Sequence, residues 1–411
     1  MTSLTPTNSA ELALSGARLD RIPGFFQSYI DAGKLPCMAT LLSRGGEVAH
    51  LAMSGAMEMG GAEAITEDTI YRIYSMTKPI TAVAAMMMFE EGKLRLEHPV
   101  SRYLPEYADV KVWDGGTPDA PKLRAPDRPM TVLDLFTHTS GITYGFLMQH
   151  EVDEIYRKEG LRGAEEGTLR ELARRIAGLP LVFSPGERFN YGHSIDVLGA
   201  IVEEVSGQTL DVFFRERIFA PLGMVDTDFF VPEDKLSRFP ACYAKDAETG
   251  DTVLYDGAGA ASKMYTKQPK LLNAGGGLVS TLHDYHRFCL MLLGGGELDG
   301  ARILSPKTIE FMTANHLPGG KTILDMGDKT FAEGRMHGNG FCLLGSVLQD
   351  LVAFGQPGSE GTFAWGGLAS TYFWIDPVEQ IIGIQMTQLV PSSSYPIRTQ
   401  FQQLAYAAIE G

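Results

Sequence analysis

Ser75 and Lys78 are the residues of this chain whose types and spacing most directly indicate chemistry. They stand three positions apart in Ser75-Met76-Thr77-Lys78, where a strand-like run ends and a helical pattern begins. This spacing places both side chains on one face of a helix, one turn apart. Backbone N–H groups at a helix start face such a hydroxyl, and a neighbouring amine can make a serine nucleophilic at neutral pH. A helix cap followed by a solvated lysine is the alternative interpretation.

Tyr191 is the candidate for a proton-transfer group. It follows a turn-rich stretch at 183–190 and precedes a helical pattern at 194–206. A phenol held toward a cleft beside an ammonium group can accept a proton from a serine. Taken alone, the residue favours the other interpretation, a tyrosine that packs at a domain junction.

The run Ala364-Trp365-Gly366-Gly367-Leu368 is a candidate for binding an oxyanion. Paired glycines let the backbone approach a ligand closely, and an N–H that follows them can point at a developing negative charge. A turn at a strand end with a packed tryptophan is the alternative.

Both ends of the chain carry the elements that must position these residues. The patterns predict a helix, a hairpin, a second pair of strands and a closing helix, at 18–34, 37–53, 371–386 and from 396 onward. We therefore predict one antiparallel sheet that is built from both chain ends and flanked by helices, an α/β (α+β) fold.

The middle of the chain has a different sequence pattern. Helical patterns dominate from 77 to about 223, a hairpin is predicted at 242–255, and 112–130 is rich in Pro, Gly and Asp, which indicates a long surface loop. We predict a sheet domain of residues 1–80 and 265–411 and a mostly helical domain of residues 81–264. The active cleft is expected at the interface between them.

The composition restricts the partners and the compartment. With 35 basic and 50 acidic residues the net charge is −15, which argues against nucleic acid and anionic membranes as partners. The four cysteines lie far apart among apolar residues, and no secretory signal or membrane-spanning run is evident. A cytoplasmic protein with free buried thiols is expected.

No motif indicates a cofactor. His283 and His286 are three positions apart but lack a third ligand, so we predict solvent-facing histidines and no metal. No serine has glycine at both −2 and +2, so the nucleophile elbow of many hydrolases is absent. A Ser–His–Asp triad stays open, because nine histidines are present.

Taken in order, the motifs resemble those of the class C β-lactamase superfamily and, within it, most closely the family VIII carboxylesterases. The resemblance implies a two-domain serine hydrolase with Ser75 as nucleophile, Lys78 and Tyr191 as its activating pair, and the N–H groups of Ser75 and Leu368 as oxyanion hole. It rests on Ser75-x-x-Lys78, Leu135-Phe136-Thr137-His138-Thr139-Ser140-Gly141, Pro185-Gly186 before Tyr191, Pro221-Leu222-Gly223-Met224 and Gly275-Gly276-Gly277-Leu278-Val279-Ser280-Thr281.

Two departures from the β-lactamase pattern separate the possible substrates. His193 stands at the asparagine position of Tyr-x-Asn, and Trp365-Gly366-Gly367 replaces Lys-Thr-Gly. An indole cannot pair with the carboxylate of a β-lactam, and losing a charge-assisted contact costs on the order of 1.5–3 kcal/mol. A neutral ester suffers no such loss, so we expect Trp365, Gly366, Gly367 and His193 to shape an ester-binding pocket.

The sequence therefore predicts a metal-independent and cofactor-free carboxylesterase that hydrolyses small to medium esters through an acyl-enzyme, with weak β-lactam hydrolysis allowed. Acyl transfer to an alcohol or amine is the nearest alternative, followed by amidase, β-lactamase or D-aminopeptidase activity with the same machinery. A non-catalytic binding module that kept the fold is the alternative from another class.

Overall fold

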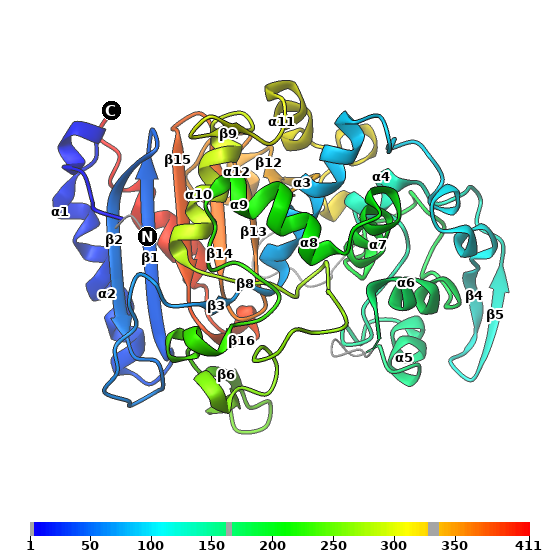
Figure 1. Cartoon of the computed structure of the whole chain (residues 1–411), viewed down its shortest axis with the longest axis horizontal. Helices are drawn as coiled ribbons and strands as arrows, with labels where there is room; N and C mark the ends of the chain where they lie inside the picture. Colours follow the sequence, from blue (N-terminus) through cyan, green and yellow to red (C-terminus); the bar gives the residue numbers. More distant parts are fainter. Residues whose placement is uncertain (1–3, 162–166, 328–336) are drawn as a thin grey trace.

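The computed structural model describes residues 4–161, 167–327 and 337–411. Its largest sheet has seven strands and joins both ends of the chain, as predicted (Figure 1). Every neighbouring pair in this sheet is antiparallel. The strand order is β11 (Asn339–Cys342), β12 (Gly345–Leu348), β13 (Phe363–Gly366), β14 (Tyr372–Asp376), β15 (Ile381–Met386), β1 (Cys37–Arg44) and β2 (Glu47–Gly55).

The N-terminal hairpin shows how the sequence produces this sheet. Gly45 and Gly46 form its turn with φ of 60° and 91°, a backbone region that favours glycine. In β1, successive side chains alternate between the two faces, because the period of a strand is two residues. Leu41 belongs to the core on one face and Leu42 to the core on the other. A strand with both faces buried therefore reads as a continuous apolar run.

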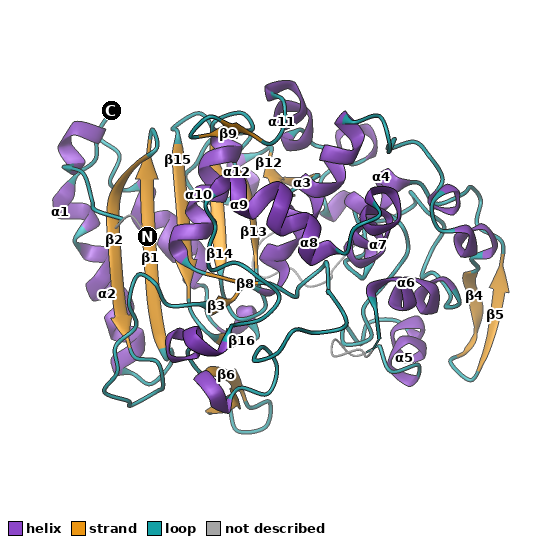
Figure 2. Cartoon of the chain, viewed as in Figure 1, coloured by secondary structure: helices purple, strands orange, loops and turns teal. Residues whose placement is uncertain are grey.

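Helices cover both faces of the sheet (Figure 2). α2 (Arg21–Asp31) and α13 (Ile397–Tyr406) pack on one face, where the ring of Phe401 contacts those of Phe26 and Trp374 at centroid distances of 6.1 and 5.0 Å. α10 (Leu282–Leu293) packs on the other, where the rings of Tyr285 and Phe373 lie 5.2 Å apart. The two apolar layers explain why both chain ends are needed to complete the domain core.

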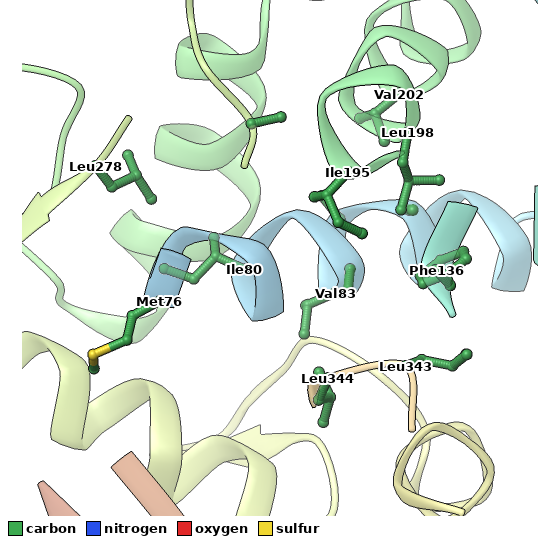
Figure 3. Packing of buried hydrophobic residues seen from close by; sticks show 14 of the residues in the cluster. Met76, Ile80, Val83, Phe136, Ile195, Leu198, Val202, Leu278, Leu343 and Leu344 are labelled. Atoms are coloured by element: carbon green, nitrogen blue, oxygen red, sulfur yellow. The ribbon is translucent and has the colours of Figure 1, made fainter. Parts of the chain in front are cut away.

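α3 (Thr77–Glu90) is the central helix beside the sheet, and its residues from Thr77 to Met88 are all buried. In Figure 3, Ile80 and Val83 of α3 lie among side chains of α7 (Ser194–Ser206), of α4 (Val132–Phe136) and of residues 343–344. A helix that is apolar on every side is held in place by its neighbours. This packing sets the position of its N-terminal end, where Ser75 and Lys78 lie.

The remaining elements complete the helical part and the connections. The further helices are α1 (Gly16–Leu19), α5 (Glu151–Lys158), α6 (Leu169–Ala177), α8 (Leu210–Phe214), α9 (Ala220–Leu222), α11 (Pro306–Thr313) and α12 (Leu351–Phe354). The further strands are β3 (Tyr71–Arg72), β4 (Val112–Thr117), β5 (Ala120–Arg124), β6 (Cys242–Lys245), β7 (Thr252–Asp256), β8 (Val279–Ser280), β9 (Glu297–Leu298), β10 (Ala301–Arg302) and β16 (Leu389–Val390).

Two predictions about local structure are wrong. Residues 112–130 are not a loop throughout, because β4 and β5 form an antiparallel hairpin at the edge of the molecule, opposite the chain termini (Figure 1). Its strands are largely exposed and therefore lack an apolar pattern. His283 and His286 do not face solvent, since both are buried on α10, and the Nε2 atom of His286 lies 2.8 Å from the Ser43 hydroxyl.

The division into residues 1–80 with 265–411 and residues 81–264 stays a prediction. The hairpin of β6 and β7 links the two predicted domains. Both strands fall in the range assigned to the helical domain, yet β6 pairs in parallel with β16 near the C-terminus. The cysteines at 37, 242, 289 and 342 are buried and free. Within the described ranges no helix is long and apolar enough to cross a membrane, and no cluster of three or more His, Cys, Asp or Glu residues could hold a metal ion.

Buried neutral histidines predict a loss of stability in mild acid. Burial lowers the pKa of His50 to about 4 and that of His286 to about 3. Because the unfolded state has a histidine pKa near 6.5, it binds more protons than the folded state, and stability falls as the pH falls from about 6.5 toward 4. Each residue accounts for about 2 kcal/mol of unfolding free energy between pH 7 and 5.

The measurement is urea unfolding of wild type and of His286→Gln at pH 7 and pH 5. The variant is expected to lose about 2 kcal/mol less than wild type over this interval. His337→Gln, which replaces an exposed histidine, serves as the control. Identical pH dependence in wild type and His286→Gln would contradict the assignment.

Candidate active site

Ser75 is presented by a strained turn between a strand and a helix. β3 ends at Arg72, residues Tyr74–Met76 form a single 3-10 turn, and α3 begins at Thr77. Tyr74 has a φ of 42°, which is uncommon for a residue with a Cβ and is found where function requires a special backbone path. Ser75 is thereby left partly exposed while the residues that follow it are buried.

Lys78 lies beneath Ser75 and contacts it directly. Its Nζ atom donates hydrogen bonds to Ser75 Oγ at 3.1 Å, to the backbone oxygen of Gly275 at 2.6 Å and to the Tyr144 hydroxyl at 3.2 Å. The residue is 5% exposed. Three acceptors match the three donors of a lysine ammonium, so the side chain is held in one orientation. The structure therefore excludes the solvated lysine that the sequence left open.

Tyr191 contacts the same lysine with its ring. Lys78 Nζ lies 4.6 Å from the centroid of the Tyr191 ring, within the range of a cation–π contact. Tyr191 is buried, and its ring lies 5.4 Å from that of Trp365. Tyr191, which is far from Ser75 and Lys78 in the chain, thus lies beside the lysine in the fold. The catalytic roles of Ser75, Lys78 and Tyr191 stay predictions at this point.

Tyr144 is a second phenol at the site, and the sequence analysis did not single it out. It comes from the segment after α4, and its hydroxyl is the third hydrogen-bond partner of Lys78. Its ring stacks on Phe146 at 4.8 Å with an interplanar angle of 19°. Its position three residues after the Thr137–Gly141 motif was the one sequence signal that could have drawn attention to it.

His193 is buried and paired with a carboxylate. His193 Nδ1 and Asp196 Oδ2 are 2.8 Å apart, and Asp196 Oδ1 accepts the N–H of Gly275 at 2.8 Å. The His193 ring lies 4.3 Å from that of Tyr144. Since Gly275 also accepts the bond from Lys78, this pair holds the backbone that orients the lysine. A role of His193 in substrate binding stays a prediction.

The turn after β13 lies against the turn of Ser75, as the predicted oxyanion hole requires. A Cβ atom on Gly367 would lie 2.2 Å from the backbone oxygen of Ile73, so only glycine permits this approach. The turn is closed by hydrogen bonds from Gly367 N to Thr371 O at 2.9 Å and from Ser370 N to Gly367 O at 3.1 Å. Leu368 follows in this turn and is partly exposed. Its N–H as an oxyanion donor stays a prediction.

Apolar and aromatic side chains surround the polar centre. Trp365 packs against Tyr191 and, edge to face at 5.3 Å, against Phe341. Phe341 belongs to a cluster of buried apolar residues, and Trp365 packs against that cluster. Its members are Tyr144, Phe189, Tyr191, Leu317, Ile323, Met326 and Phe341. A cavity of about 10 Å³, close to the room that one water molecule needs, lies beside Lys78 and Trp365.

His138 is a neutral neighbour of this centre. Burial and the positive charge of Lys78 hold its pKa well below the usual value. Its ring lies 4.6 Å from that of Tyr191, and its Nδ1 atom accepts the N–H of Gly192 at 3.4 Å. These contacts give His138 a structural role in placing the segment that carries Tyr191.

Comparisons with known proteins extend over nearly the whole chain. A family model described as beta-lactamase matches residues 22–407, a range that contains every candidate site residue. An uncharacterized protein of Mycobacterium tuberculosis (strain CDC 1551 / Oshkosh) is 34% identical over 376 residues, which cover 92% of this chain and 91% of the relative. Esterase EstB of Burkholderia gladioli is 29% identical over 427 residues, which cover 98% and 99%.

A solved structure has the same architecture. That structure is EstCE1, described as a hydrolase with promiscuous acyltransferase activity. It is 25% identical and superposes with a TM-score of 0.77, covering 96% of this chain and 98% of the other. The sheet and helices described above are therefore those of a β-lactamase-like fold, as the sequence analysis expected.

Gly367→Ala tests whether the close approach of the two turns matters. The added Cβ would meet the Ile73 oxygen at 2.2 Å and the Thr371 hydroxyl at 2.3 Å, and it would push the turn after β13 away from the segment that leads into Ser75. The rate at which a fluorophosphonate labels Ser75 is expected to fall about 100-fold. Gly24→Ala is the control, because a Cβ there meets nothing within 4 Å. Labelling of Gly367→Ala at the wild-type rate would mean that the turn does not need this approach.

Proposed function

We propose, from the premise that this chain belongs to the β-lactamase family, that it is a serine hydrolase which cleaves small to medium carboxylic esters through an acyl-enzyme. The observation that carries the proposal is the hydrogen bond between Lys78 Nζ and Ser75 Oγ, made by a buried lysine that also contacts two tyrosines. A buried amine beside a serine hydroxyl is a recognised way of making the serine nucleophilic.

In the acylation step, Ser75 Oγ attacks the carbonyl carbon of the ester. Its proton passes to the Tyr191 phenolate, or is shared between Tyr191 and Lys78, whose Nζ atom contacts the tyrosine ring. The N–H groups of Ser75 and Leu368 stabilise the oxyanion of the tetrahedral intermediate. Collapse of this intermediate breaks the C–O bond to the alcohol, and the leaving alkoxide takes up the proton.

Deacylation repeats these steps with water as the nucleophile. The Tyr191–Lys78 pair takes a proton from water, the resulting hydroxide attacks the acyl carbon, and the proton returns to Ser75 Oγ as the acid leaves. Gly275 and the buried pair of His193 and Asp196 keep Lys78 in place through both halves of the cycle.

The lining of the site favours a neutral ester over a β-lactam. Trp365 stands where a lysine would pair with a carboxylate, and it extends the aromatic surface formed by Tyr191 and Phe341. The similarity to esterase EstB over the full length of both chains supports the same choice.

Acyl transfer is the second candidate function. It is favoured by the similarity to EstCE1, a hydrolase with promiscuous acyltransferase activity, and an acyl-enzyme does not dictate whether water or an alcohol accepts the acyl group. Amide and β-lactam cleavage use the same chemistry. A non-catalytic binding module is disfavoured because the serine, the lysine and the tyrosine are all present and in contact.

Ser75→Ala tests the nucleophile. Hydrolysis of p-nitrophenyl butyrate is expected to fall by roughly 10⁴-fold or more, since no covalent intermediate can form. Ser101→Ala is the matched control, because Ser101 also lies partly exposed in a 3-10 turn. A folded Ser75→Ala protein with near wild-type turnover would remove Ser75 from the mechanism. Nitrocefin and an added alcohol acceptor, measured alongside, rank lactam hydrolysis and acyl transfer against ester hydrolysis.

Two phenylalanine variants separate the roles of the two tyrosines. Tyr191→Phe is expected to lower kcat by about 10²- to 10⁴-fold, because it removes the proton acceptor and keeps the ring under Lys78. Tyr144→Phe removes one hydrogen bond of Lys78 and is expected to lower kcat about tenfold. Steady-state kinetics with p-nitrophenyl butyrate provide the measurement. The reverse order of effects would assign the proton transfer to Tyr144 instead.

A further inference from the structure

Arg398 of the C-terminal helix contacts the turn after β13, which borders the candidate site. It lies near the start of α13, and its Nη2 atom donates hydrogen bonds to the backbone oxygens of Gly367 at 2.6 Å and Thr371 at 2.8 Å. These oxygens belong to the two ends of the turn that carries Leu368. One guanidinium nitrogen therefore ties both ends of the turn to α13.

Gly366 makes room for this arginine. A Cβ atom on Gly366 would lie 2.4 Å from Arg398 Cζ and 2.5 Å from Nη2, so the guanidinium rests on bare backbone. The neighbouring Gly367 is needed for a different contact, with the Ile73 oxygen at the turn of Ser75. The paired glycines thus let the turn after β13 contact the turn of Ser75 on one side and Arg398 on the other.

Arg398 keeps its charge although it is buried. Burial lowers the pKa of Arg398 to about 9, and the Tyr191 phenol opposes this shift. The guanidinium is therefore a cation at neutral pH, and its hydrogen bonds to the oxygens of Gly367 and Thr371 are charge-assisted.

We propose that Arg398 is a positioning residue of the active site, which holds the turn of the Leu368 N–H in place through its hydrogen bonds to Gly367 and Thr371. The inference rests on the proposed function for the part that concerns the oxyanion. A substrate would meet a donor already fixed in position, so this part of the oxyanion hole does not have to be organised during the reaction.

The test uses two substitutions. Arg398→Met removes both the positive charge and the hydrogen bonds to the turn, whereas Arg398→Lys keeps a charge on a side chain that ends one atom short of Nη2, the nitrogen that bonds both carbonyl oxygens. Arg44→Met is the matched control, since Arg44 also donates to backbone oxygens, those of Leu12 and Ala13 near the N-terminus. Urea unfolding of each variant gives its folded fraction.

The first readout does not depend on any substrate. The rate at which a fluorophosphonate labels Ser75 is measured for each variant. It is expected to fall about 10-fold in Arg398→Met and to keep the wild-type value in Arg44→Met. An unchanged labelling rate in folded Arg398→Met would overturn the proposal.

The second readout is the reaction itself. With p-nitrophenyl butyrate, both Arg398 variants are expected to lose about 10- to 100-fold in kcat with little change in KM, while Arg44→Met keeps the wild-type values. Should Arg398→Met fail to fold, wild-type kcat in Arg398→Lys would still refute the positioning role. Wild-type protein that labels with fluorophosphonate but hydrolyses no ester would reject the proposed substrate class and leave the labelling rate to test Arg398.

Discussion

A buried lysine with three hydrogen-bond partners is the interaction on which the candidate site depends. A charged or polar group that leaves water must find partners in the protein, and Lys78 finds a hydroxyl, a phenol and a backbone oxygen. These partners come from three separate segments of the chain, so the lysine can be satisfied only when the sheet, α3 and the helical part are assembled. The burial of α3 along its length supplies the rigidity that this arrangement needs.

Close backbone contact is the second constraint on the site. The turn of Ser75 carries a left-handed residue at Tyr74, and the turn after β13 approaches it so closely that Gly367 has no room for a side chain. Arg398 occupies the space that Gly366 leaves on the opposite side. Strain of this kind persists only where the surroundings determine the backbone strongly, and here a seven-stranded sheet and α13 do so.

Local patterns predicted the parts of the fold that local physics decides. The hairpin at Gly45 and Gly46 and the closing helix α13 are confirmed, because turn residues and apolar periodicity act over a few positions. The β4–β5 hairpin was missed because its exposed strands bury no alternating face. His283 and His286 were placed in solvent because the sequence does not show that α10 is covered on the side where they lie.

The sequence by itself determined the family, the antiparallel sheet built from both chain ends, and the pairing of Ser75 with Lys78, since a spacing of three residues on a helix sets that contact locally. Only the tertiary structure decided that Tyr144 is the second phenol on Lys78, that Asp196 and His193 support Gly275, and that Arg398 holds the turn after β13. Lys78 and Tyr144 are 66 positions apart, Asp196 and Gly275 are 79, and Arg398 and Gly367 are 31. No periodicity records such encounters, because they arise from the packing of whole elements.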